Sequence, residues 1–442
     1  MFVSGGGDSE YVLNFILSQL MILGGDDEAA LPFLERSVEL MPEGREIDLS
    51  GHVIYFHRGR IYQFQQEYTD AVRDYSRSIK IKPHTATYIN RGVVYSRLGE
   101  GEKALADFNN AVESDPTNAM ALNNRGVVYK AFQKYDQAIA DFKAAIKSDP
   151  TYFDPHFNLG NTYFLLGELD EAMKAYNSAM EIAPTRSEPY TARGDIYFNE
   201  QEYERARQDY ERALELNPKD SAAYVGLGNV YYMLEDVDEA LDAYGKAIKL
   251  NPKLVDPYFR RGNLLAALDK CSEAIKDFTK AIKLDPKLAQ PYNGRGYCYL
   301  QLGKFDTALS DLNKAIKIDP MYVQAYYNRG NVYLTTDEYD KAIKDYDRVI
   351  ELQPDAAIAY FRRGLSHALK GSDLKAAIKD FEKAVELDPT NPGFYQALGT
   401  AYEDNGQDAE ALEAYRKYVE LAGEEADPDV IDAIEKLEKK LK

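Results

Sequence analysis

Histidine and cysteine are the side chains in this sequence whose chemistry most often serves metal binding, acid–base catalysis or nucleophilic attack. The two cysteines are Cys271 and Cys298, and the five histidines are His52, His57, His84, His156 and His367. The histidines are scattered without H-E-x-x-H spacing, and the sequence contains no G-x-x-x-x-G-K-[ST] phosphate loop. Buried free cysteines usually serve packing. We therefore predict that the chain is not an enzyme and has no catalytic residue, no metal site and no cofactor.

Net charge and cysteine content limit the class of partner and the compartment. The formal net charge is −20, so no excess of Lys and Arg is available to bind nucleic acid or an anionic membrane surface. The most apolar stretch, residues 11–23, is too short and too interrupted by polar residues for a signal peptide or a membrane span. Two cysteines give no disulfide framework. We predict a cytoplasmic protein that binds protein or peptide partners, with a periplasmic or extracytoplasmic location as the alternative if a targeting segment was removed.

Asparagine recurs at a spacing that suits binding. Asn90, Asn124 and Asn158 follow one another at intervals of 34 residues. An asparagine amide both donates and accepts hydrogen bonds, so a regular row of these amides suits the backbone of an extended peptide whatever its sequence. Such a row needs structural elements that repeat with the same period.

Three other residue types show that the chain has this period. Prolines recur every 34 residues at Pro116, Pro150, Pro184, Pro218, Pro252, Pro286, Pro320 and Pro354. Glycines recur in step at Gly59, Gly92, Gly126, Gly160, Gly194, Gly228, Gly262, Gly296, Gly330, Gly364 and Gly399. Alanines, each usually followed four residues later by an aromatic residue, recur at Ala71, Ala104, Ala138, Ala172, Ala206, Ala240, Ala274, Ala308, Ala342, Ala377 and Ala411.

Between these markers, apolar residues recur at helical spacing in two blocks, which predicts two amphipathic helices, A and B, in each unit. The glycine of helix A and the alanine of helix B let the two backbones approach closely, and aromatic residues fill the space beside that contact. Proline ends helix B because neither proline nor the residue before it favours a continued helix. The sequence therefore predicts an all-α array of helix pairs.

This pattern resembles the tetratricopeptide repeat, a helix–turn–helix unit with a period of 34 residues. The tryptophan usual in that family is replaced by Tyr88, Tyr190, Tyr224, Tyr258, Tyr292, Tyr326 and Tyr360. The resemblance covers roughly residues 11–425 and implies a right-handed α–α superhelix of about twelve repeats. We expect a flexible leader at residues 1–10, a degenerate first repeat at 11–44, eleven tandem units at 52–425 and a C-terminal capping helix at 426–442.

The two ends of the array differ in character. The last helix places Val430, Ile434, Leu437 and Leu441 on one face and charged residues elsewhere, as expected of a helix that caps a solenoid. The first helix is apolar all around over residues 11–23. We hypothesise that a partner or a second copy of the chain covers this end. The alternative is that the leader and the second helix of the first repeat bury it.

In the tetratricopeptide family, helix A lines the concave face, and ligand contacts come from repeat positions 2, 5, 6, 9, 12 and 13. With each repeated glycine at position 8, the resemblance implies polar contacts at position 6 from Asn90, Asn124, Asn158, Asn328, Arg260 and Arg362. It implies contacts at position 9 from Asn161, Asn229, Asn263 and Asn331. It implies aromatic contacts at positions 5 and 12 from Phe157, Phe164, Phe198, Tyr232 and Phe259. We predict that these residues bind a peptide.

The asparagine series resembles the asparagine ladder of O-linked N-acetylglucosamine transferases, which implies hydrogen bonds to a peptide main chain. Each such bond contributes only about 0.5–1.5 kcal/mol net, and ordering the ligand offsets much of the sum, so we expect micromolar affinity. The alternative is that these residues are common in the family whatever it binds. The clamp by which related repeats grip Hsp70 and Hsp90 tails needs lysine at position 5, which no unit has, so chaperone-tail binding is not expected.

Arginine stands at position 7, where leucine is usual, in Arg58, Arg91, Arg125, Arg193, Arg261, Arg295, Arg329 and Arg363. Aspartate stands at a fixed offset in helix B, in Asp74, Asp107, Asp141, Asp209, Asp277, Asp311, Asp345 and Asp380. We interpret these residues as structural Arg–Asp pairs, which fix geometry more than they add stability.

These patterns predict an interaction scaffold that binds an extended peptide or partner segment in its concave groove. The alternative function is an accessory or assembly subunit of a larger enzyme or cell-envelope complex that docks through the ends of the array.

Overall fold

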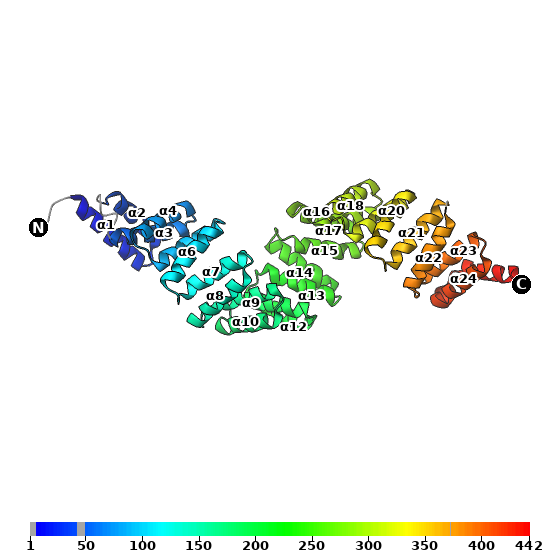
Figure 1. Cartoon of the computed structure of the whole chain (residues 1–442), viewed down its shortest axis with the longest axis horizontal. Helices are drawn as coiled ribbons and strands as arrows, with labels where there is room; N and C mark the ends of the chain where they lie inside the picture. The colour runs from blue at the N-terminus through cyan, green and yellow to red at the C-terminus, as the bar shows by residue number, and fades with distance from the viewer. Residues whose placement is uncertain (1–5, 42–48, 372) are drawn as a thin grey trace. The chain divides into compact units, whose positions relative to one another are not determined.

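The structure is a computed structural model that describes residues 6–41, 49–371 and 373–442. These residues form α-helices, turns and one short 3₁₀ helix, with no β-strand among them. The α-helices follow one another in pairs, A then B (Figure 1). Within each of the two units described below, each pair packs against the next pair in the chain. The predicted all-α repeat array is confirmed. The chain divides into two compact units, Met1–Pro218 and Lys219–Lys442.

The first unit holds six helix pairs. Its A helices are α1 (Gly6–Leu23), α3 (Leu49–Phe64), α5 (Thr85–Arg97), α7 (Ala119–Ala131), α9 (Phe153–Leu166) and α11 (Glu188–Asn199). Its B helices are α2 (Asp27–Glu39), α4 (Tyr68–Ile81), α6 (Gly101–Ser114), α8 (Tyr135–Ser148), α10 (Leu169–Ile182) and α12 (Tyr203–Leu216).

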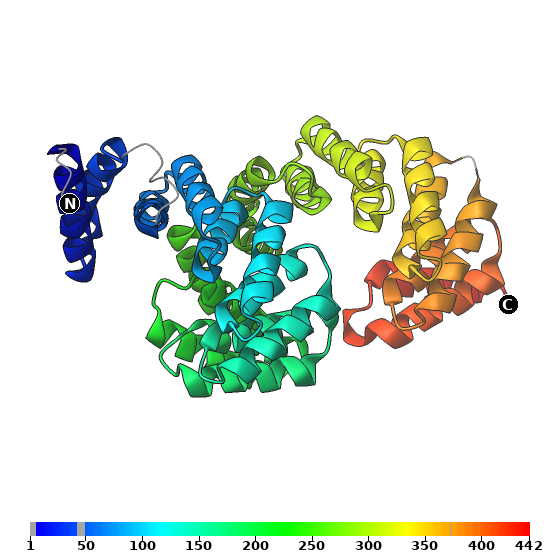
Figure 2. The ribbon, with the colours of Figure 1, turned by 60° about the vertical axis from the view of Figure 1, so that its left-hand side comes forward.

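The second unit holds six more pairs and a final helix. Its A helices are α13 (Ser221–Met233), α15 (Asp256–Ala267), α17 (Ala289–Gln301), α19 (Val323–Thr335), α21 (Ala357–Lys370) and α23 (Pro392–Asp404). Its B helices are α14 (Val237–Leu250), α16 (Cys271–Leu284), α18 (Phe305–Ile318), α20 (Tyr339–Leu352), α22 (Leu374–Leu387) and α24 (Asp408–Ala422). The 3₁₀ helix η2 (Gly423–Glu425) and α25 (Pro428–Lys440) follow. Figure 2 gives a second view of the same helices.

The turn from helix A to helix B requires one residue with positive φ. Glycine supplies it after several A helices, as at Gly167 and Gly303 with φ of 77° and 69°. In six other repeats a non-glycine residue takes this conformation, as at Asp269 with φ of 57°. An L-residue there costs about 1 kcal/mol relative to the right-handed region, so these six turns depend on the packing of their two helices.

Close approach of helices A and B explains the glycine at position 8. A Cβ atom added at Gly160 or Gly228 would lie 2.5 Å from the ring of Tyr176 or Tyr244 in helix B. The repeated alanine of helix B is also fully buried, as Ala240 shows. The aromatic ring of helix B therefore rests directly on the backbone of helix A, as the sequence predicts.

All eight predicted Arg–Asp pairs form. In each, Nε and Nη2 of the arginine donate to the two carboxylate oxygens of one aspartate, as in Arg125 to Asp141 at 2.7 and 2.7 Å. The hydrogen bonds that Arg125 donates to Asp141 raise the pKa of Arg125 above its ordinary value. The complete set is Arg58–Asp74, Arg91–Asp107, Arg125–Asp141, Arg193–Asp209, Arg261–Asp277, Arg295–Asp311, Arg329–Asp345 and Arg363–Asp380.

The same arginines link consecutive repeats. In six of them Nη1 donates to a side chain of the preceding helix B, so one guanidinium connects three helices. The acceptors are Ser76, Asn109, Asn177, Thr279, Asn313 and Asp347. Where position 7 is leucine, the offset that holds aspartate elsewhere holds alanine, in Leu159–Ala175, Leu227–Ala243 and Leu398–Ala414. The repeats thus use two matched pairs, Arg with Asp or Leu with Ala.

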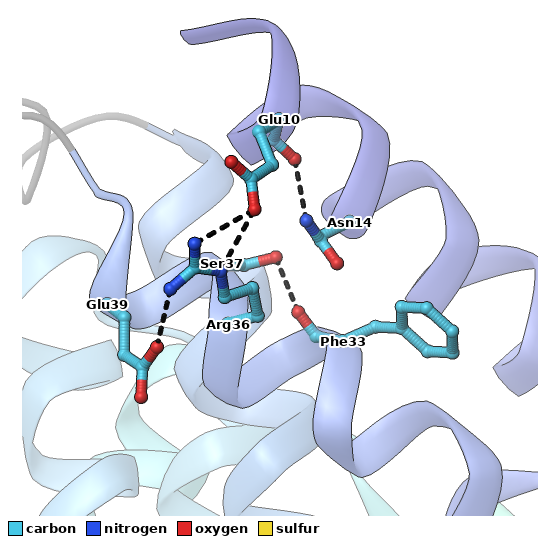
Figure 3. Close-up of polar contacts among 6 residues, drawn as sticks. All are labelled: Glu10, Asn14, Phe33, Arg36, Ser37 and Glu39. Atoms are coloured by element: carbon cyan, nitrogen blue, oxygen red, sulfur yellow. Dashed lines mark hydrogen bonds and ion pairs between the residues drawn. The ribbon is translucent and has the colours of Figure 1, made fainter. Parts of the chain in front are cut away.

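The first helix begins earlier than expected. α1 starts at Gly6, so residues 6–10 of the expected flexible leader are helical, while residues 1–5 lie outside the described residues. Figure 3 shows why the helix continues through Glu10, whose carboxylate accepts from Nε and Nη2 of Arg36 on α2 at 3.0 and 2.9 Å. Asn14 also donates to the Glu10 carbonyl at 2.8 Å (Figure 3).

The last helix covers the final B helix. Val430 and Leu437 of α25 are buried against α24, and the backbone N–H of Asp427 donates to the Tyr418 hydroxyl at 2.9 Å. The apolar face predicted for this helix is thus its packing face. Across the described residues, no helix is both long and apolar enough to cross a bilayer.

Candidate peptide-binding surface

The position-9 asparagines have a structural partner in helix B. Asn161 accepts a hydrogen bond from the Tyr176 hydroxyl at 2.8 Å, and Asn229 accepts one from Tyr244 at 2.9 Å. Asn331 accepts from Tyr346 at 2.8 Å in the same way. Burial raises the pKa of these tyrosines above the ordinary value, so each hydroxyl keeps its proton and needs an acceptor. These amides therefore satisfy buried tyrosines with their oxygen and keep their NH₂ group for other contacts.

The residue at position 9 follows the type of aromatic residue in helix B. Where the ring is phenylalanine, as in Phe108 and Phe142, position 9 is Val93 or Val127. Asn263 departs from this rule because its counterpart is Phe278, which has no hydroxyl group. Asn263 is exposed, and no residue of the described chain hydrogen-bonds to it. Asn263 is therefore the position-9 asparagine without a structural role.

The position-6 asparagines divide in the same manner. Nδ2 of Asn158 donates to Asn123 of the preceding A helix at 3.0 Å, and Asn328 donates to Asn293 at 2.9 Å. Both acceptors are themselves buried. Asn124 is half-buried, and its amide has no hydrogen-bond partner within the described part of the chain. Asn158 and Asn328 thus join adjacent repeats, whereas the Asn124 amide makes no such link in the described part of the chain.

Asn90 lies in a cavity of about 480 Å³ between α3 and α5. The cavity is lined by Arg60, Gln63, Phe64, Gln66, Tyr68, Asn90 and Arg97. Phe64 is 82% exposed, which is unusual for a phenylalanine on a folded surface. Both charged lining residues are cations in a chain of net charge −20. The cavity offers amide donors, an aromatic face and positive charge, a combination that suits an anionic peptide segment.

Of the seven residues that line this cavity, sequence reasoning predicted only Asn90, and it missed both cations and the exposed ring. Arg60 stands at position 9, and Phe64 and Arg97 stand at position 13, counting each repeated glycine as position 8. These positions were already expected to face a ligand. The signal was therefore present, but a search for regular asparagine rows passed over single arginines.

Most of the predicted aromatic contacts belong to the core. Phe157 packs against Tyr176 with ring centroids 5.8 Å apart, and Phe259 packs against Phe278 at 6.3 Å. Phe164 packs on the cluster around Tyr176, and Phe198 lies 5.7 Å from the Tyr203 ring. Tyr232 is the most open of the five predicted aromatic residues, at 55% exposure. Their sequence pattern reflects packing between helices A and B, and Tyr232 presents most of its ring to solvent.

The two predicted arginines differ in their surroundings. Arg260 pairs with Asp256 one turn earlier at 2.7 Å, and both side chains are about half-exposed. Arg362 has a buried Nε with no hydrogen-bond partner. The positive charge of Arg362 acts on the nearby Tyr346 hydroxyl. An unpaired buried N–H costs about 1–3 kcal/mol, so the Arg362 side chain carries an energetic cost in this arrangement.

The fold defines a helical repeat protein built from consecutive pairs of antiparallel helices. Models of the tetratricopeptide repeat match residues 52–85, 85–118, 108–140, 153–186, 191–254, 327–392 and 381–413. A TPR repeat model matches residues 131–167, 262–303 and 296–337. Together the matches cover well over half of the chain. The chain belongs to the tetratricopeptide repeat family.

Similarity to individual proteins is local. The chain is 30% identical over 118 residues to a UDP-N-acetylglucosamine–peptide N-acetylglucosaminyltransferase of Giardia intestinalis, which covers 26% of this chain and 7% of that protein. It is 33% identical over 75 residues to the photosystem I assembly protein Ycf3 of Rippkaea orientalis, covering 16% of this chain and 43% of that protein. The chain thus spans less than half the length of either relative. The crystal structure of YrrB, a TPR protein with an unusual peptide-binding site, is 30% identical with a TM-score of 0.38, covering 42% of this chain and 96% of YrrB.

Proposed function

We propose that this protein is an interaction scaffold that binds an extended, acidic peptide segment along α3, α5 and α7. The supporting observation is the cavity at Asn90, where Arg60 and Arg97 provide positive charge and Phe64 provides an exposed ring. The proposal concerns the first unit alone, since these helices all belong to it.

Three kinds of contact contribute to binding. The exposed Phe64 ring gains about 1.5–3 kcal/mol if a ligand covers it fully. Arg60 and Arg97 can bind carboxylates through charge-assisted hydrogen bonds, which are about twice as strong as neutral ones. Asn124, one repeat further on, holds an unused amide at the same position as Asn90. In this proposal the asparagine amides hydrogen-bond to the backbone of the peptide, and the two arginines bind its acidic side chains.

The test uses a photo-crosslinking amino acid at Phe64, with the same group at exposed Lys174 on helix B as the matched control. The chain is used as bait in a lysate of its source, and crosslinked partners are sequenced. We expect the Phe64 probe to capture acidic segments that the Lys174 probe does not. Changing Asn90 and Asn124 together to alanine should abolish the Phe64 products. The same products from both probes, or their survival in the double variant, would place the interface outside this surface.

A second candidate function, docking through the N-terminal end, is supported by the exposure of α1. Leu13 and Leu20 are 55% and 58% exposed. In every later A helix the residues at these two repeat positions are buried, as Ile54 and Ile61 of α3 show. The outward face of α1 therefore matches the face that other A helices bury against the preceding repeat.

This second candidate predicts an interface at α1. Changing Leu13 and Leu20 to glutamate should release a partner, or a second copy, that the unchanged chain retains in size-exclusion chromatography with light scattering. Loss of binding in this variant but not in the Asn90 and Asn124 variant would favour docking through the end of the array.

A further inference from the structure

The repeats of Arg193 and Arg329 each build a complete binding site for their own guanidinium group. The Arg329 guanidinium lies between the rings of Tyr326 and Tyr333, 5.6 and 5.9 Å from their centroids. It donates two hydrogen bonds to Asp345 on its own helix B. It donates a third, at 2.6 Å, to Asn313 on the preceding helix B. Two aromatic faces and acceptors on two B helices thus define what we call the guanidinium site.

The last helix pair keeps part of this site and lacks the arginine. Tyr395 and Tyr402 stand at the same offsets as Tyr326 and Tyr333. Leu398 stands in place of arginine, with Ala414 in place of aspartate. Glu382 of α22 stands where Asn313 accepts the third hydrogen bond in the earlier repeat. Both aromatic rings and the acceptor of the preceding helix therefore remain, while the cation is missing.

The missing arginine leaves a cavity of about 670 Å³ among α22, α23 and α24. Its walls are Glu382, Val385, Tyr395, Leu398, Tyr402, Glu410, Glu413, Ala414, Arg416, Lys417 and Glu420. Sites that bind small ligands usually measure about 300–1,000 Å³. The cavity has an apolar floor at Leu398 and Ala414, and its volume accommodates an arginine side chain with adjoining backbone.

The charges around the cavity favour a cation. Arg416 pairs with Glu438 of α25 at 2.6 Å, and Lys417 pairs with Glu420 at 2.6 Å. Glu410 and Glu413 have no such cationic partner in the described structure. Burial and the hydrogen bond to Glu382, together with these two carboxylates, raise the pKa of Tyr402 above its ordinary value.

In the absence of an arginine, the Tyr402 hydroxyl is the hydrogen-bond donor to Glu382. Its carboxylate accepts a hydrogen bond from the Tyr402 hydroxyl at 2.6 Å. One hydroxyl satisfies only one of the acceptor positions of a carboxylate. Glu382 is exposed and keeps acceptor positions for a guanidinium that enters between Tyr395 and Tyr402.

The other two Leu–Ala repeats carry a lysine near one of their tyrosine rings. Nζ of Lys143 lies 5.6 Å from the Tyr163 ring in the repeat of Leu159. Nζ of Lys246 lies 5.7 Å from the Tyr224 ring in the repeat of Leu227, and it also pairs with Asp242 at 2.8 Å. Glu382 of the last repeats stands at the offset of Lys143, so the cavity at Leu398 has a carboxylate where the repeat of Leu159 has a cation.

We propose that this cavity binds an arginine side chain of a partner protein. The guanidinium stacks between Tyr395 and Tyr402, where Arg is favoured over Lys because its planar group stacks on rings and donates in two directions. It donates to Glu382 and to Glu410 or Glu413, while the aliphatic part of the side chain covers Leu398. This site is distinct from the surface at Asn90 and requires a basic partner.

The test probe is N-acetyl-arginine methylamide, compared with the citrulline analogue, which has the same shape without the charge, and with the lysine analogue. Binding to the full chain is followed by saturation-transfer NMR. The blocking variant is Leu398→Arg with Ala414→Asp, which supplies the chain's own guanidinium as in the other eight pairs. The matched control, Leu159→Arg with Ala175→Asp, makes the same exchange elsewhere. Circular dichroism melting shows that each variant folds.

We expect the arginine probe to bind at least about tenfold more tightly than the citrulline probe, a factor equal to about 1.4 kcal/mol. Binding should be lost in the blocking variant and retained in the matched control. Glu382→Gln, which removes one charge and keeps the shape, should weaken binding several-fold without changing the fold. Equal binding of arginine and citrulline, equal binding of arginine and lysine, or full binding by the blocking variant would each overturn the proposal.

Discussion

Gly245 gives a sharp test of how the arginines link neighbouring repeats. In the second unit, Arg295, Arg329 and Arg363 each donate from Nη1 to the preceding helix B. Arg261 has no such acceptor, because the equivalent position is Gly245 in the interior of α14. A Cβ atom added at Gly245 would lie 3.5 Å from Nη1 of Arg261, an ordinary contact distance. Gly245→Asn should therefore fit and supply the missing acceptor.

The magnitude follows from three terms. Replacing an interior helix glycine by alanine gains about 0.5–1 kcal/mol. Asparagine is a poorer helix former than alanine by roughly 0.5 kcal/mol. A hydrogen bond to a charged group contributes about 1.5–3 kcal/mol at a buried site, and about 1 kcal/mol is reasonable for Arg261, whose side chain is 26% exposed. The Gly245→Asn variant should thus be more stable than the Gly245→Ala variant by about 0.5 kcal/mol, because the hydrogen bond outweighs the poorer helix propensity of asparagine.

The assay is native-state hydrogen exchange of amides in α14 and α16, which reports the free energy of local opening. Both variants are compared in the normal chain and in a chain with Arg261→Leu and Asp277→Ala, the pairing that other repeats use. Without Arg261 the order of stability should reverse. The Gly245→Asn variant should then have a free energy of local opening roughly 0.5 kcal/mol lower than that of the Gly245→Ala variant. If asparagine is no better than alanine while Arg261 is present, the three-helix link does not hold the repeats together as the geometry indicates.

Three further changes test the packing and the titrating groups. Gly228→Ala should lower the free energy of unfolding by about 1–3 kcal/mol through overpacking, because the added Cβ would lie 2.5 Å from the Tyr244 ring. An unchanged melting temperature would contradict the close approach of the two helices. Tyr244→Phe should lower the free energy of unfolding in urea by about 1 kcal/mol, because Asn229 loses its hydrogen-bond donor. Adding Asn229→Val should restore most of that stability. If the second change restores none of it, the pairing of Tyr244 with Asn229 is excluded. Burial lowers the pKa of His52 below 6.5, and its ring hydrogen-bonds to Ser78 at 2.7 Å. Because the unfolded chain then binds the proton first, stability of α3 and α4 should fall as the pH drops below 6.5. Hydrogen exchange at about pH 7 and pH 5 checks this, and His52→Gln should remove the dependence.

The sequence was sufficient for the fold because each structural requirement is met by one residue type at a fixed interval. A glycine at Gly228 is needed where the Tyr244 ring touches the backbone. Arg329 and Asp345 meet because their offset places both at the contact between helices A and B. Both patterns repeat many times, so the sequence alone identifies them.

The candidate binding residues were harder to sort because one asparagine side chain can serve packing or a ligand. The hydroxyl of Tyr176 explains Asn161, and the sequence contains a sign of this, since Phe108 and Phe142 at the same place go with valine at position 9. The cavity at Asn90 was not readable, because it depends on how Arg97 of α5 and Phe64 of α3 lie across two helices. Periodicity reports which face a residue is on, and only packed side chains show which groups remain unpaired.

The two matched pairs, Arg with Asp and Leu with Ala, constrain how repeats of this array can diverge after duplication. Losing Asp345 alone would leave Arg329 buried without its counterion, and losing Arg329 alone would strand a nearly buried carboxylate. Either half-change costs about 3–5 kcal/mol, a large part of the stability of a typical domain. A lineage therefore passes from one pair to the other only through a compensated double substitution. Each leucine at this position, Leu159, Leu227 and Leu398, accordingly has an alanine at the fixed offset and no isolated carboxylate.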